Sequence, residues 1–281
     1  MTIHINPDAP HNTLLARYDS LGELTDTLLA FKGSTDHIGG RNSSWAGKDL
    51  PSACREALAG VPDSETELAR KLLSRINTLV DARPRMERQR HVAGQRVNMG
   101  AYVSGLPKNM IRRRSTVSDV APIKLVMEIT VSAGVTDTAL QKRGAALAAL
   151  AYALSKTRPV SLFVCWALGG TGKHNTCMGI VKIPTSPLSL SQALAVMGTN
   201  SFARRLSFTE VATNGYTYGG WGLGKFGRPG DAARVTAFRE VLGLNPQDIF
   251  LPGGHLTEQD KMLADPVTWV NSYLDAQRGQ V

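Results

Sequence analysis

Residues 83–114 hold nine Lys or Arg residues and one acid, Glu87. This stretch therefore carries a net charge of +8, out of +9 for the whole chain of 281 residues. Positive charge concentrated in so short a stretch favours a polyanionic partner more strongly than a uniformly basic surface does. The segment predicts a nucleic-acid contact through Arg83, Arg85, Arg88, Arg90, Arg96, Lys108, Arg112, Arg113 and Arg114.

A second stretch that could bind nucleic acid is the glycine-rich segment 214–230. It interleaves aromatic and cationic side chains, namely Tyr216, Tyr218, Trp221, Lys225, Phe226 and Arg228. Bases stack on exposed rings while cations follow the phosphates, so this combination favours single strands over duplex. Two other interpretations stay open: the rings cover the sheet as a packed loop, and the arginine run is an ordinary solvated surface.

No catalytic motif accompanies these residues. The stretch Gly-Gly-Thr-Gly-Lys at 169–173 lacks the Gly and the Ser or Thr of a phosphate-binding loop, because Ala167 and His174 stand there. The six histidines are scattered, no nucleophile elbow surrounds a serine, and Glu65 and Glu67 are better explained as first-turn helix residues. We expect a binding protein without enzymatic activity, cofactor or metal.

The elements that would position these residues are clearest over 123–168. Residues 123–131 alternate as a half-buried strand does, an alanine-rich helix follows over 138–155 with caps available at Thr136, Asp137 and Thr138, and 160–168 reads as a buried strand. A strand, a helix and a strand with short connections form a βαβ unit. The sequence therefore predicts an α/β fold with a largely parallel sheet covered by helices.

The rest of the chain is assigned from shorter patterns. Apolar spacing predicts a helix over 14–31 with start signals at Asp19 and Ser20, a surface loop over 32–47 with Trp45 packed back onto the body, and a helix over 64–81. Further strands are expected at 177–183, 206–211 and 248–251, and further helices at 188–197, 231–242 and 266–276. We divide the chain into a helical N-terminal region (1–82), a basic connecting segment (83–118) and an α/β core domain (119–281).

Composition sets further limits. Cys54, Cys165 and Cys177 are an odd number and lie far apart, which favours reduced thiols over a disulfide framework. The first thirty residues lack the basic start followed by an apolar stretch that is typical of a signal peptide, and no stretch has the roughly 18 apolar residues that a membrane helix needs. We expect a soluble cytoplasmic protein.

Several blocks are familiar as a set, namely SLGEL near Ser20, residues 43–62, residues 91–113, and ITVSAGV at 129–135 with the helix behind it. Together they resemble an uncharacterised family of tailed-bacteriophage proteins. The resemblance implies a phage-encoded protein made in the cytoplasm of an infected bacterium. It brings no catalytic residues.

The strand-helix-strand core is also similar to a von Willebrand factor A domain, in which an Asp-x-Ser-x-Ser motif after the first strand binds a divalent cation. Glu128, Thr130 and Ser132 stand at those positions. Glu is longer than Asp by a methylene, and a hard octahedral ion tolerates displaced oxygens poorly. These residues are alternatively just the second face of an alternating strand.

The leading hypothesis is a sequence-tolerant single-stranded DNA-binding accessory protein acting in viral replication or transcription. Its expected partners are nucleic acid, a phage or host polymerase, and further copies of itself in a homo-oligomer. The alternatives are a virion or assembly component and a non-enzymatic protein-interaction module with a degenerate metal site.

Overall fold

A computed structural model describes residues 2–6, 13–33, 43–79, 86–115, 122–131, 134–157, 159–169, 176–214 and 232–253, with residues 265, 268 and 272. No described helix combines the length and the apolar composition needed to cross a membrane. All three cysteines are buried free thiols, as expected.

The central sheet confirms the predicted α/β class. Its strands lie in the order β1-β2-β8-β7-β6-β9, with bounds Thr2–Asn6, Thr13–Tyr18, Thr176–Ile183, Val160–Gly169, Ile123–Glu128 and Ile249–Leu251. The pairs β2–β8, β7–β6 and β6–β9 are parallel, whereas β1–β2 and β8–β7 are antiparallel. This mostly parallel sheet flanked by helices is consistent with a Rossmann-like or von Willebrand A-like core.

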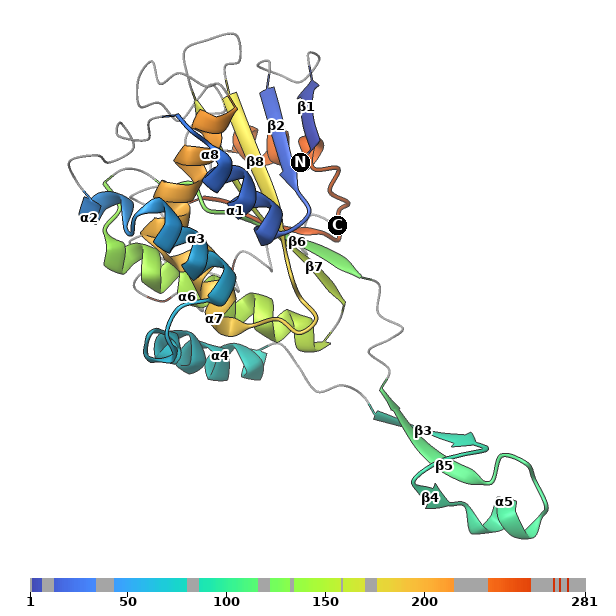
Figure 1. Ribbon diagram of the computed structural model, residues 1–281. Coiled ribbons are helices and arrows are strands. Elements are labelled where there is room, and N and C mark those ends of the chain that lie inside the picture. The colour runs from blue at the N-terminus through green and yellow to red at the C-terminus, as the bar shows by residue number, and fades with distance from the viewer. Residues whose placement is uncertain are drawn as a thin grey trace.

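Helices cover both faces of the sheet (Figure 1). The larger core joins one face to α1 (Leu21–Ala30), α3 (Leu50–Ala59), α4 (Glu67–Leu79), α6 (Asp137–Thr157), α7 (Leu190–Gly198) and α8 (Ser207–Thr213). The smaller core joins the opposite face to α9 (Ala232–Val241) through Phe238. Burial on both faces explains why β6 is not the half-buried strand that its alternation predicted: Leu125 and Met127 pack in the larger core and Val126 in the smaller one.

The predicted βαβ unit is confirmed by β6, α6 and β7. Thr136 caps α6, because its Oγ1 accepts a hydrogen bond from the backbone N–H of Ala139 (3.3 Å). Helices α6 and α7 cross at two glycines, and a Cβ on Gly144 would lie 2.1 Å from the Cα of Gly198. Small residues therefore set the distance at which these two helices pack.

One predicted strand is wrong. Residues 206–211 lie in a π-helix (Ser201–Leu206) that continues into α8. Their alternation of apolar and polar residues resembles a strand, but the hydroxyls of Ser207 and Thr209 donate to the carbonyls of Ala203 and Arg205 one turn earlier (2.7 Å each). The polar residues are thus satisfied inside the helix without facing water.

The helix expected over 14–31 is correct only in its second part. Residues 13–18 form β2, because Leu14 and Ala16 pack in the larger core and Leu15 packs in the smaller one, so that an apolar run on both faces mimics helical spacing. The helix α1 begins after Ser20, which caps it by accepting from the N–H of Glu23 (3.1 Å). The helix expected over 64–81 is α4, preceded by a 3-10 turn at Asp63–Thr66.

Most of the other predicted elements agree with the structure, but the loop expected over 32–47 is wrong at its end, where residues 43–46 form a short helix, and residues 34–42 lie outside the described residues. Strands β8 and β9 and helices α7 and α9 lie where they were expected. Trp45 does pack onto the body, at the short helix α2 (Ser43–Ala46), with its ring centroid 5.7 Å from that of Phe208 and the Arg204 guanidinium over it. Of the helix expected over 266–276, only residues 268 and 272 are described, and both are helical.

The basic segment contains a second, smaller sheet, which we call the arm (residues 86–115). It comprises β3 (Met86–His91), β4 (Arg96–Val97), α5 (Met99–Val103) and β5 (Met110–Ser115), with its antiparallel strands in the order β3-β5-β4. Figure 1 shows the arm standing apart from the body that the central sheet and its helices form.

Candidate nucleic-acid interface

The register of the arm gathers its arginines on shared faces. Arg88 is the Cα partner of Arg113, and both Arg90 and Arg96 pair with Ile111. Side chains of directly paired residues lie on the same side of an antiparallel sheet. Arg88, Arg90 and Arg96 therefore occupy one face, although they come from the two outer strands.

The described cations of the arm face solvent. Arg88, Arg90, Arg96, Lys108 and Arg112 are all exposed, and none forms an ion pair with a carboxylate in the described ranges. Exposed cations without a carboxylate partner are available to a polyanion.

The arm also exposes apolar side chains. Val92, Val97, Met99, Tyr102, Val103 and Leu106 are all exposed, Val103 to 80%, and Ala101 is the only buried side chain among those described in the arm. A three-stranded sheet ordinarily needs a hydrophobic face packed on something. The apolar surface of the arm is therefore available to a partner.

Tyr102 is a candidate that the sequence reasoning missed. Its side chain is 61% exposed, and it lies in α5, which follows β4 and precedes β5 along the chain. The sequence signal was available, because Tyr102 is the only aromatic residue in the basic segment 83–114.

Several predicted site residues lie outside the described residues. They are Arg83, Arg85 and all six from the glycine-rich segment, namely Tyr216, Tyr218, Trp221, Lys225, Phe226 and Arg228. Arg113 and Arg114 are described as backbone positions of β5. The structure thus brings Arg88, Arg90 and Arg96 together on one face, with Arg112 and Lys108 on the same arm.

The glycine-rich stretch at 169–173 is not followed directly by a helix among the described elements, as a phosphate-binding loop would be. Strand β7 ends at Gly169, and the next described element is β8, which begins at Thr176 and runs antiparallel to β7. A phosphate-binding loop leads into a helix whose N-terminus points at the phosphate. The stretch at 169–173 connects two neighbouring strands instead.

The carboxyl end of β6 is occupied by a cation from the protein itself. Glu128 is fully buried, and its Oε2 accepts from the N–H of Gly253 (2.9 Å). Arg143 of α6 donates to the carbonyls of Glu128 and Pro252 (2.7 Å each). Burial lowers the pKa of Arg143 to about 10, and the charge of Glu128 opposes that shift.

Thr130, the second position of the motif that resembles a metal site, also uses its side chain in a hydrogen bond within the protein. Its Oγ1 accepts from the N–H of Ala167 (3.0 Å), while Ser132 lies outside the described residues. Across the described ranges, no three His, Cys, Asp or Glu side chains are grouped as metal ligands. Glu128 and Thr130 therefore act as packing and hydrogen-bonding residues at the end of β6.

A buried carboxyl group, Glu210 of α8, also went unnoticed in the sequence. Tyr18 Oη donates to its Oε1 (3.1 Å), Trp166 Nε1 donates to its Oε2 (2.9 Å), and Asn214 Nδ2 donates to Oε1. Burial raises the pKa of Glu210 to about 7, although these three hydrogen bonds lower it. Gly179 makes room for the indole, since a Cβ there would lie 2.2 Å from the Trp166 ring. Because every oxygen already has a donor, we assign Glu210 a structural role.

The family match spans both the body and the arm. Residues 2–259 match the family described as Domain of unknown function (DUF7192). The chain belongs to this family. No curated protein and no solved structure matches it. The description of this family names no activity, so the surface of the arm is the observation that bears on function.

Proposed function

We propose that this DUF7192 protein is a nucleic-acid-binding accessory protein whose arm binds single-stranded DNA without sequence preference. The observation that carries the proposal is the exposed face of Arg88, Arg90 and Arg96, which no described carboxylate neutralises. As part of the same proposal, the resemblance to tailed-bacteriophage proteins supports a role in viral replication or transcription in the cytoplasm of an infected bacterium.

The chemistry of the arm suits a single strand. Arg88 and Arg90 are two residues apart on one strand, which places their Cα atoms about 6.7 Å apart along the sheet. A row of cations follows a sugar-phosphate backbone in any sequence, and backbone contacts of this kind position a ligand without reading its bases. Tyr102 supplies a ring on which a base can stack, worth about 1–3 kcal/mol.

Fluorescence anisotropy tests the proposal with labelled single-stranded DNA, duplex DNA and RNA at several salt concentrations. If about five of the seven Lys or Arg residues of the arm meet phosphates, the slope of log affinity against log salt should be about −3.5 for a single strand. Affinity then falls about a hundredfold between 50 and 200 mM salt. A slope near zero, or tighter binding to duplex, would contradict the proposal.

A matched pair of variants separates a specific face from net charge. Replacing Arg88, Arg90 and Arg96 by Ala should make the salt slope shallower by about 2. Replacing Lys71, Lys142 and Lys182 by Ala, all exposed on the body, removes the same charge and should leave the slope unchanged. Equal losses in both variants would mean that binding is diffuse and not a property of the arm.

A virion or assembly role is the second candidate, because the apolar surface of the arm fits a protein partner as well. In that case the arm packs against another subunit and the cations face packaged genome. Mass spectrometry of purified particles distinguishes the two: an accessory protein is absent from them, and an assembly component is present at fixed stoichiometry.

A further inference from the structure

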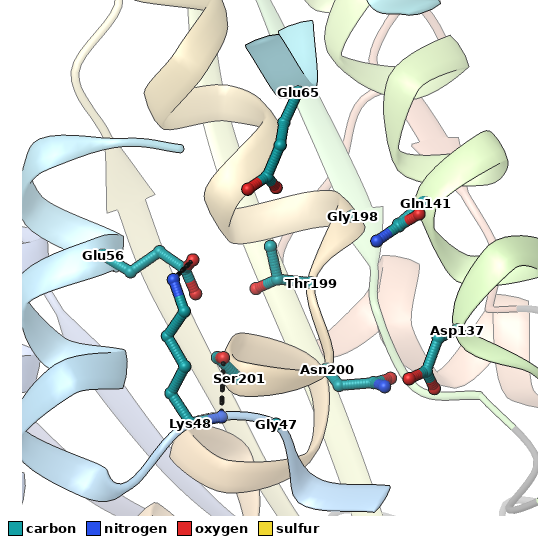
Figure 2. A pocket seen from close by; sticks show the side chains of 10 residues that line it. All are labelled: Gly47, Lys48, Glu56, Glu65, Asp137, Gln141, Gly198, Thr199, Asn200 and Ser201. Atoms are coloured by element: carbon teal, nitrogen blue, oxygen red, sulfur yellow. Dashed lines mark hydrogen bonds and ion pairs between the residues drawn. The ribbon is translucent and has the colours of Figure 1, made fainter. Parts of the chain in front are cut away.

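A polar pocket of about 390 Å³ lies on the body, among the helices that pack on the larger core (Figure 2). It forms where five segments meet: the Gly47–Lys48 turn, α3, the 3-10 turn, the first turns of α6, and the junction between α7 and the π-helix. The charged or amide side chains that line it are Lys48, Glu56, Glu65, Asp137, Gln141 and Asn200. Its volume falls in the range of small-molecule sites.

Two buried oxygen atoms in the lining have no hydrogen-bond donor in the described part of the protein. They are Oε2 of Glu56, a residue that is 8% exposed, and Oδ1 of Asn200, which is 9% exposed. The other oxygen of Glu56, Oε1, pairs with Nζ of Lys48. Buried acceptors without partners are costly and rare in folded proteins, so their presence here points to a missing donor.

The charge of the pocket identifies the kind of donor. Three carboxylates (Glu56, Glu65 and Asp137) face one lysine, which leaves a net charge of −2 on the lining. Arg204 approaches Asp137 from outside the lining at 3.6 Å. Glu65 has no ion pair within the described ranges, and Figure 2 shows its carboxylate turned toward the interior of the pocket. The lining therefore favours a cation that carries several N–H groups.

The walls of the pocket are held in place before any ligand arrives. Gly47 has a φ of 76°, and a Cβ there would lie 2.7 Å from the backbone nitrogen of Ser201. The N–H of Lys48 donates to Oγ of Ser201 (3.2 Å), and Oγ1 of Thr199 donates to the carbonyl of Ala195 (2.7 Å). The pocket also adjoins the π-helix. Helices of this kind are rare in proteins, and those that occur are often found at functional sites.

We propose that this pocket binds a small organic cation with a guanidinium or primary ammonium group. Such a group offers three to five N–H donors, enough to supply Oε2 of Glu56 and Oδ1 of Asn200 together. Glu65 and Asp137 balance its charge. The ligand is a small molecule, and the site is separate from the nucleic-acid surface of the arm.

Isothermal titration calorimetry on nucleic-acid-free protein tests this, because residual nucleic acid would itself bind such cations. The probes are agmatine and putrescine, with 1,4-butanediol as the neutral counterpart of putrescine and succinate as an anion. We expect one site with a dissociation constant below about 1 mM for one or both cations and no heat from the other two. Binding of succinate, or no binding of either cation, would overturn the proposal. Agmatine alone would assign the guanidinium, and putrescine alone the ammonium.

Two variants of Gln141, one that adds a positive charge and one that adds a negative charge, test where the cation binds. Gln141 lies exposed in α6 and lines the pocket, so Gln141→Lys and Gln141→Glu should both fold. We expect Gln141→Lys to weaken cation binding about tenfold or more and Gln141→Glu to strengthen it about threefold or more. Glu56→Gln should abolish binding; if it fails to fold by circular dichroism, the Gln141 pair still decides. Unchanged affinity in both Gln141 variants would show that the cation binds elsewhere.

Discussion

At the residue scale, Glu210 is the clearest case in which position overrides type. A glutamate on an isolated helix faces water, but this one is fully buried and accepts from Tyr18, Trp166 and Asn214. These partners come from β2, from β7 and from the residue after α8. The cost of burying the charge is met partly by hydrogen bonds and partly by the raised pKa.

This pKa makes a prediction about pH. Between the ordinary value of 4.5 and about 7, the folded protein keeps a proton on Glu210 that the unfolded chain has lost. The free energy of unfolding contributed by this group is therefore complete below about pH 4.5 and falls as the pH rises to 7, by up to about 1.4 kcal/mol per unit. Glu210→Gln should flatten this decline in urea denaturation series, whereas Glu240→Gln, an exposed control, should not. A decline that persists in Glu210→Gln would refute the assignment.

Tyr102 makes a second prediction at this scale. Replacing it by Ala removes a stacking platform, so affinity for single-stranded DNA should fall by about five- to a hundredfold. Tyr102→Phe keeps the ring and should retain most of the affinity. Because Tyr102 is largely exposed, neither change should alter the melting temperature. Equal losses in the two variants would point to the hydroxyl instead of the ring.

At the element scale, the crossing of α6 and α7 depends on two glycines. A Cβ on Gly144 would collide with backbone atoms, the Cα of Gly198 and the carbonyl oxygen of Met197, which lies at 2.7 Å. Backbone cannot rotate away as a flexible side chain does, so the helices themselves must separate.

We therefore expect Gly144→Ala to lower the free energy of unfolding by about 1–3 kcal/mol. The matched control is Gly22→Ala in α1, where the new Cβ meets only Ser20 Oγ at 3.7 Å and where Ala favours the helix. Gly22→Ala should leave the stability unchanged or raise it by up to about 1 kcal/mol. Urea denaturation measures both. An undiminished stability in Gly144→Ala would mean that the helices do not cross this closely.

At the scale of the whole molecule, most of the excess positive charge lies apart from the body that contains the hydrophobic core. Outside residues 83–114 the chain has 23 Lys or Arg and 22 Asp or Glu, so the remainder is nearly neutral. The arm carries a net charge of +6 out of +9 for the chain, and the body holds the core and the polar pocket. The molecule therefore divides into a neutral scaffold and a cationic appendage.

This separation predicts that the arm can be removed. Met86 and Ser115 are Cα partners at the open end of the arm, so a short Gly-Ser linker can replace residues 86–115. The shortened protein should keep its cooperative unfolding and its cation binding but lose salt-dependent binding of single-stranded DNA. Circular dichroism, calorimetry and anisotropy on the same preparation measure these properties. If the shortened protein still binds single-stranded DNA, the binding surface lies on the body and the prediction is wrong.

Some of this could be predicted from the sequence. The alanine-rich helix with its flanking strands predicted the βαβ unit, because high helix propensity and short connections are local properties. The basic segment was also apparent, since charge is counted along the chain. The hydrophobic pattern gave the wrong element in two places. Residues 14–18 form a strand whose burial on both faces hides the alternation of a strand. Residues 206–211 are helical, and their hydroxyls bond to the preceding turn of the helix, so polar residues at alternate positions did not indicate a strand.

The sequence by itself determined where the positive charge is concentrated and that helices cover a largely parallel sheet. Only the tertiary structure decided that Arg88, Arg90 and Arg96 share a face and that Glu128 lies beside an arginine. It also decided that Glu56 and Asn200, which line one pocket, each keep a buried oxygen without a donor among the described residues. The physical reason is that charge and helix propensity belong to each residue, whereas register, burial and hydrogen-bond partners depend on segments that are distant in the chain and meet only in the fold.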